Sequence, residues 1–118
     1  FRSSIHCNAA GNGSNWMQAR GWEAWTSVGQ TKADKLADYL YGAAEEYLPG
    51  MKIRKDMADG DPDKESSFYI LKHTKCPAVL TENLFQDNKE DVDFLLSEEG
   101  KRTIVSLHVK GICKYLKV

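Results

Sequence analysis

Hydrophobic residues recur along the chain at two different spacings, and this change of period predicts alternating strands and helices. A short apolar stretch contains Phe1, Ile5 and Cys7, and Trp22 opens a second segment of alternating apolar and polar positions. Pro77 precedes a continuous apolar run, which is typical of a buried strand. The predicted strands are residues 1–9, 21–28 and 78–83, with an edge strand at 51–55 and an ambiguous segment, strand or helical turn, at 66–73.

Three helices are predicted from apolar residues that recur at helical spacing. The first spans residues 31–48 and ends before Pro49-Gly50. Asn88 can cap a short helix that runs through Leu96, and Ser97 can cap the last helix. The expected buried faces, in chain order, are Leu36, Leu40, Ala43 and Tyr47, then Val92, Leu95 and Leu96, then Ile104, Leu107, His108, Ile112 and Tyr115.

The order of these elements indicates an α/β fold, with a mostly parallel sheet and helices packed on both of its faces. With 118 residues the chain has room for a single core, so residues 1–118 are predicted to form one domain. The chain begins with Phe1-Arg2-Ser3 instead of Met, which reads like the interior of a longer protein. The absence of a targeting segment therefore carries no meaning.

Composition excludes several classes of partner. A net charge of -1, with 28% charged residues, predicts neither a nucleic-acid footprint nor a membrane-surface footprint. No run approaches the roughly 18 apolar residues that a membrane span requires. Cys7, Cys76 and Cys113 are far apart and lack C-x-x-C spacing, so we expect buried or half-buried free thiols.

Two residues with candidate chemistry lie where an apolar strand gives way to a polar loop, the place where open α/β sheets usually carry their sites. His6 ends the first strand and could be a structural histidine or a metal ligand. Glu82 interrupts the buried strand after Thr81, where an unpaired carboxylate is costly. We expect it to be paired, to face a metal, or to have a raised pKa suited to acid/base work.

The other candidate groups favour structural interpretations. His73 lies in a basic turn and is expected to be solvated, whereas His108 is expected to be a satisfied core histidine. The acidic stretch at 56–63 departs from a calcium loop because Gly60 comes too early and no glutamate closes it. The tryptophans could either form a sugar-stacking face or pack in the core and at its rim; they are Trp16, Trp22 and Trp25.

Four segments carry a family pattern in order along the chain. Residues 4–9 read S-I-H-C-N-A, residues 21–27 read G-W-E-A-W-T-S, residues 68–72 read F-Y-I-L-K, and residues 77–88 read P-A-V-L-T-E-N-L-F-Q-D-N. Together with the helix around Leu36, they resemble the zinc-dependent N-acetylmuramoyl-L-alanine amidases of the amidase_3 type, which cleave bacterial peptidoglycan. The resemblance covers about the C-terminal two-thirds of that catalytic domain.

The resemblance implies a zinc hydrolase that cleaves the amide between N-acetylmuramic acid and the L-alanine of the stem peptide. His6 would be a zinc ligand, and Glu82 would be the general base acting on a zinc-activated water. A peptidoglycan glycopeptide would be the partner, in the cell envelope or outside the cell. The chain itself does not specify the compartment.

The resemblance also has a gap, because the other two zinc ligands of the family are expected upstream of residue 1. We therefore expect the chain alone to bind zinc weakly and to lack amidase activity. Without an N-terminal strand and helix, the domain would expose a sheet edge, which we expect an oligomer to cover. Two alternatives stay open: a non-catalytic cell-wall-binding or structural module built on the same scaffold, and another zinc hydrolase of the carboxypeptidase-like kind.

Overall fold

A computed structural model describes residues 1–26, 31–54, 64–65 and 75–118. Of the predicted strand at 51–55, the described residues 51–54 contain one isolated bridge, between Ile53 and Trp22. The expectations for the 66–73 segment, His73 and the acidic 56–63 stretch lie outside the described residues. The elements are β1 (Arg2–Asn8), β2 (Trp22–Thr26), α1 (Thr31–Tyr47), β3 (Lys64–Glu65), β4 (Ala78–Phe85), α3 (Lys89–Leu96) and α4 (Glu98–Leu116).

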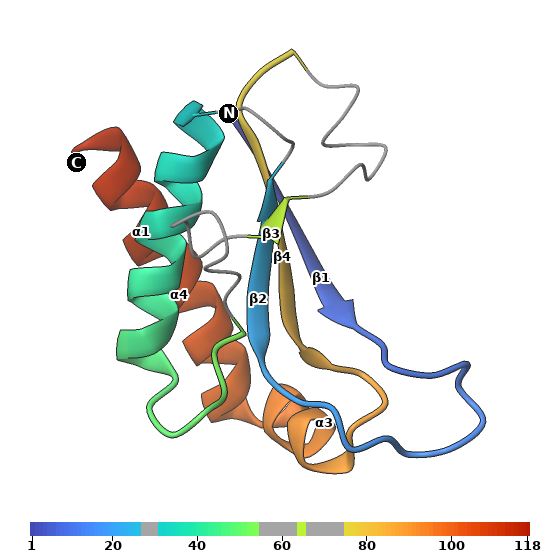
Figure 1. Cartoon of the computed structure of the whole chain (residues 1–118). Coiled ribbons are helices and arrows are strands. Elements are labelled where there is room, and N and C mark those ends of the chain that lie inside the picture. Colours follow the sequence, from blue (N-terminus) through green and yellow to red (C-terminus); the bar gives the residue numbers. More distant parts are fainter. Residues whose placement is uncertain (27–30, 55–63, 66–74) are drawn as a thin grey trace.

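The strands form a mixed sheet in the order β1-β4-β2-β3 (Figure 1). β1 pairs with β4 in parallel and β2 pairs with β3 in parallel, but the central pair of β2 and β4 is antiparallel. The α/β class is confirmed, whereas the mostly parallel sheet is not. The alternating pattern of strands and helices could not reveal that β4 runs against β2, because pattern alone does not give strand direction.

Two long helices, α1 and α4, lie on the same face of the sheet (Figure 1). Their apolar residues enclose the main core together with Trp22 and Val79. The opposite face carries a small cluster of Ala78, Leu80 and Trp25, and no helix in the described ranges covers it. The expectation of helices on both faces is therefore not met by this part of the chain.

The helices pack closely enough that one glycine is required at their contact. A Cβ on Gly111 of α4 would lie 2.7 Å from Leu40 Cδ2 and 3.1 Å from Leu40 Cα in α1. Leu107 and His108 are buried beside it, and Ile104, Ile112 and Tyr115 pack against the core, so the predicted stripe of α4 is confirmed.

The predicted N-caps of α3 and α4 are both confirmed. The Asn88 side chain accepts a hydrogen bond from the Asp91 N–H at 3.0 Å, and Ser97 Oγ accepts one from the Gly100 N–H at 2.9 Å. The inner face of α3 differs from the prediction, because Leu96 is 70% exposed. The fully buried residue of α3 is Asp91, whose carboxylate a pattern of apolar residues could not identify.

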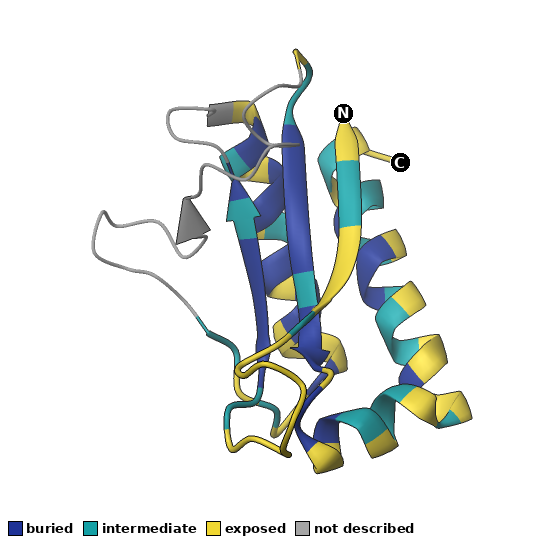
Figure 2. Cartoon of the chain, turned by 90° about the vertical axis from the view of Figure 1, so that its right-hand side faces the viewer, coloured by how far each residue is buried: buried dark blue, intermediate teal, exposed yellow. Residues whose placement is uncertain are grey.

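Burial is greatest in the middle of the sheet. β4 is buried along most of its length, whereas β1 forms an exposed edge (Figure 2). Phe1 and Ile5 on this edge are 48% and 57% exposed. The expected oligomer that would cover this edge stays a prediction. Within the described ranges, no helix has the length and apolar character to cross a membrane.

Candidate active site

Three ionisable side chains form a row across the sheet. In the strand register His6 of β1 is the partner of Glu82 in β4, and Glu82 is also the partner of Glu23 in β2. Thr81 faces α4, because its Oγ1 lies 2.8 Å from His108 Nε2. Adjacent strand residues point to opposite faces, so the row lies on the face that α1 and α4 leave open.

Glu82 is the unusual member of the row. Its side chain is half-buried, and its Oε2 atom is buried without a hydrogen-bond partner among the described residues. Burial raises the pKa of the Glu82 carboxyl; His6 partly offsets this rise, and the negative charge of Glu23 adds to it. A carboxylate with a raised pKa and one unpaired oxygen is suited to accept and return a proton.

His6 is exposed beside Glu82 and is held mainly through its backbone. Its carbonyl accepts a hydrogen bond from Asn83 Nδ2 at 3.0 Å, and its Nε2 lies 2.9 Å from Ser4 Oγ. Asn83 is itself fixed, because its Oδ1 accepts a hydrogen bond from the buried Trp22 Nε1 at 2.7 Å. The imidazole therefore projects from a rigid strand and can reach a ligand above the open face.

Glu23 and Asn8 belong to the site although sequence reasoning assigned them no role. Glu23 is 3% exposed, and its Oε1 accepts a hydrogen bond from Asn8 Nδ2 at 2.6 Å. Its Oε2 lies 3.3 Å from Arg54 Nε. The pairing register of β1 with β4 shifts between His6 and Asn8, an irregularity of the kind that is common beside active sites. Both Asn8 and Glu23 lie in the segments 4–9 and 21–27 that resemble the family, and this position is the sequence feature that could have indicated a role for them.

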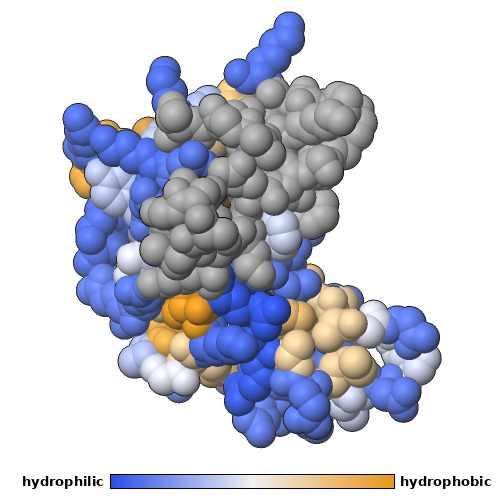
Figure 3. Space-filling model, in the orientation of Figure 1, coloured by the Kyte–Doolittle hydropathy of each residue, from blue (hydrophilic) through white to orange (hydrophobic). Residues whose placement is uncertain are grey.

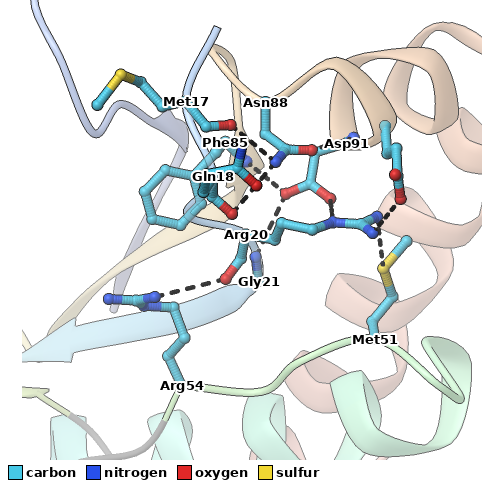
Figure 4. Close-up of polar contacts among 10 residues, drawn as sticks. Met17, Gln18, Arg20, Gly21, Met51, Arg54, Phe85, Asn88 and Asp91 are labelled. Carbon is cyan, nitrogen blue, oxygen red and sulfur yellow. Dashed lines mark hydrogen bonds and ion pairs between the residues drawn. The ribbon is translucent and has the colours of Figure 1, made fainter.

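A buried carboxylate supports the strand ends next to the row (Figure 4). Asp91 has 0% exposure and accepts hydrogen bonds from Arg20 Nε at 2.8 Å, from the Phe85 N–H at 3.0 Å and from the Gly21 N–H at 3.3 Å. Arg20 also forms an ion pair with the exposed Glu90. Asp91 thus joins α3 to β4 and to the start of β2.

The other candidates from the sequence are not members of the row. His108 is buried, with Nδ1 donating to the Ile104 carbonyl at 2.7 Å, and burial lowers the pKa of its ring. This agrees with a structural histidine. Trp22 is part of the core, Trp25 packs on the open face, and Trp16 is 59% exposed. Cys7, Cys76 and Cys113 form no disulfides; Cys76 and Cys113 are half-buried as expected, whereas Cys7 is exposed.

The described residues do not complete a catalytic zinc site. His6 has the right donor chemistry, and the unpaired oxygen of Glu82 suits a base beside a metal. However, no group of three His, Cys, Asp or Glu side chains that could hold a metal occurs in the part of the chain that the structure describes. A catalytic zinc ion needs three protein ligands, so these residues supply only part of the set.

Comparisons with known proteins give a consistent result. The chain is 32% identical over 117 residues to an endolysin of Bacillus phage SPP1, covering 98% of this chain and 40% of the endolysin. It is similar in structure to an N-acetylmuramoyl-L-alanine amidase from Clostridium difficile 630, with a TM-score of 0.81, 27% identity and coverage of 98% and 56% of the two chains. It is also similar to the catalytic domain of the CD27L endolysin targeting Clostridia difficile, with a TM-score of 0.67, 30% identity and coverage of 95% and 53%.

The chain therefore spans less than two-thirds of each of these relatives. The sequence model of the Amidase_3 family, described as N-acetylmuramoyl-L-alanine amidase, matches residues 3–114. Because this match includes nearly the whole chain, together with both strands that carry His6 and Glu82, the protein belongs to the Amidase_3 family of N-acetylmuramoyl-L-alanine amidases.

Proposed function

We propose that the row of His6, Glu82 and Glu23 is part of the active site of a peptidoglycan amidase, in which Glu82 is the general base and His6 is a zinc ligand. The observation that carries the proposal is the buried, unpaired Glu82 oxygen next to His6 on the open face. An unsatisfied buried oxygen is costly to the fold, and an acid/base role accounts for its presence.

Glu82 can perform both proton transfers that amide hydrolysis requires. Its free oxygen can take a proton from the attacking water and later return it to the leaving nitrogen. The raised pKa brings the proton affinity of the carboxylate closer to what these transfers need. Zinc, held by His6 and by ligands from outside the described residues, would supply polarisation of the scissile carbonyl.

The proposed substrate is the amide between N-acetylmuramic acid and L-alanine in peptidoglycan, the bond that the family description implies. The site of action would be the cell wall, reached from the envelope or from outside the cell. The open face suits a polymeric substrate, because no described helix covers the row.

The decisive test is zinc content and murein hydrolysis, measured on this chain and on a version that includes any coding sequence preceding Phe1. We expect the chain alone to bind little zinc and to release no stem peptides. The extended version should bind one zinc ion and release stem peptides that begin with L-alanine, and a chelator should stop the release. An extended version with tightly bound zinc that leaves murein intact but cleaves small peptides would contradict the amidase assignment. One that binds murein without cleaving it would favour a cell-wall-binding module.

A second test concerns the contact between Asn8 and Glu23. In the version that cleaves murein, Asn8→Ala should lower kcat/KM by about 10- to 100-fold, the usual effect of removing a group that orients a ligand-bearing element. Loss of the 2.6 Å hydrogen bond frees the strand end that carries His6. Steady-state kinetics and the urea unfolding midpoint should be measured together. An unchanged kcat/KM with a lowered midpoint would mean that the contact stabilises the fold alone.

A further inference from the structure

A pocket of about 700 Å³ lies where β1 and β4 end. The segment from Ala9 to Trp16, which follows β1, forms one wall, and Gln86 and Asp87, which follow β4, form the other. We call residues 9–17 the β1 loop. Figure 3 shows it as the arm at the lower right of the molecule, with hydrophilic atoms at its tip. The candidate active site uses none of these residues.

The β1 loop is held firmly on the turn after β4. Both oxygens of Asp87 accept hydrogen bonds from the Ala10 N–H, at 3.1 and 3.0 Å, and one also accepts from the Gly11 N–H at 2.8 Å. The Asp87 carbonyl accepts a hydrogen bond from the Met17 N–H at 2.6 Å. The Gly11 and Ala10 N–H groups hold the pKa of the Asp87 carboxyl below its usual value. The pocket is thus formed before a ligand arrives, which reduces the entropic cost of binding.

The lining combines polar and apolar groups, and its one charged side chain is Asp87, whose carboxylate already accepts hydrogen bonds from the β1 loop. Among the described residues, the side chains of Asn15 and Gln86 make no hydrogen bonds, so their amides are free to pair with a ligand. Trp16 presents an indole that is 59% exposed. The Lys89 ammonium lies 5.9 Å from this ring, but Asp93 balances its charge at 2.9 Å.

This chemistry fits a sugar better than an anionic peptide. An indole offers a flat apolar surface on which the C–H face of a pyranose can stack, and free amides can both donate to and accept from hydroxyl and acetamido groups. An anionic stem peptide would call for an unpaired cation, and the nearby Lys89 is already matched.

The pocket also lies at a suitable distance from the proposed chemistry. Gln86 follows Glu82 by four positions along the chain, which corresponds to at most about 13 Å at the rise of an extended strand. A ligand in the pocket could therefore be part of the same polymer whose amide reaches Glu82.

We infer that the pocket between the β1 loop and the turn after β4 is a glycan subsite that binds an N-acetylhexosamine unit of murein, with Trp16 as the stacking platform and Gln86 and Asn15 as hydrogen-bonding groups. The inference rests on the proposed function for the identity of the polymer. Its binding chemistry is independent of hydrolysis.

The test measures binding of a peptide-free N-acetylglucosamine tetramer to this chain by tryptophan fluorescence and calorimetry. We expect saturable binding that Trp16→Ala weakens at least tenfold and Gln86→Ala weakens severalfold. Tyr47→Ala, which removes another exposed aromatic ring on α1, should leave the Kd unchanged. Thermal melting of each variant checks that the fold is intact.

The subsite would be overturned by an absence of tetramer binding at millimolar concentration, or by tetramer binding that Trp16→Ala leaves intact. Binding of a free stem peptide that Trp16→Ala abolishes, without binding of the tetramer, would also overturn it. Failure of the amidase assay leaves these readouts untouched, because the tetramer contains no scissile amide. Conversely, if the Trp16→Ala variant of the extended protein hydrolysed murein with an unchanged KM, the subsite would be refuted and the proposed function would stand.

Discussion

Replacing Glu82 with glutamine is expected to lower murein hydrolysis by about 10²- to 10⁴-fold, the usual contribution of a general base. Glutamine keeps the shape of the side chain but cannot take the proton of the attacking water. The measurement is release of stem peptides from murein by the extended protein. The variant should unfold at the same or a higher urea concentration than the parent, because it replaces a partly buried negative charge beside Glu23 with a neutral amide of the same shape.

The matched control is Glu99→Gln, which makes the same change at an exposed position on α4 and should leave activity unchanged. The combination of lost activity and retained stability separates a chemical role from a structural one. Near-normal turnover in Glu82→Gln would refute the assignment of the base. Lost activity accompanied by a large fall in stability would indicate a structural carboxylate.

Replacing Asp91 with alanine is expected to lower the free energy of unfolding by about 2–6 kcal/mol, because two buried N–H groups lose their acceptor at a cost of about 1–3 kcal/mol each. The change leaves the N–H groups of Phe85 and Gly21 without their acceptor and removes the buried partner of Arg20. Urea unfolding followed by circular dichroism gives the comparison. Asp91→Asn should cost less, because its amide oxygen can still accept one of these bonds.

Glu90→Ala is the control, since Glu90 pairs with the same Arg20 from an exposed position. Its side chain is 76% exposed, so the loss should be at most about 1 kcal/mol. If Asp91→Ala and Glu90→Ala lowered the free energy of unfolding by similar amounts, the ion pairs of Arg20, and not the buried hydrogen bonds of Asp91, would account for the stabilisation.

Local features of the chain were predictable because they depend on neighbouring residues. Asn88 and Ser97 cap their helices as expected, since a cap needs only its own side chain and the N–H groups that follow. The stripe on α4 follows from helical spacing alone. His6 and Glu82 were identifiable because short motifs surround them.

The remaining features depend on contacts between distant segments. The alignment of His6, Glu82 and Glu23 is a matter of register between three strands, which no local pattern encodes. Asp91 looks like an ordinary polar residue in the first turn of a helix, and only the positions of Arg20 and Gly21 explain its burial. The antiparallel run of β2 against β4 escaped prediction for the same reason.

The inner face of β4 has a consequence for how the strand can align. Thr81 and Asn83 point toward the helices and are linked, because Asn83 Nδ2 donates to Thr81 Oγ1 at 2.9 Å. Since His108 Nδ1 donates to a carbonyl, its neutral ring leaves Nε2 to accept from the Thr81 hydroxyl. If β4 shifted its register by one residue, Glu82 would point toward the helices, and Thr81 and Asn83 would point to the open face. Such a network penalises every misaligned pairing, so the polar groups behind the sheet determine which carboxylate can face the substrate.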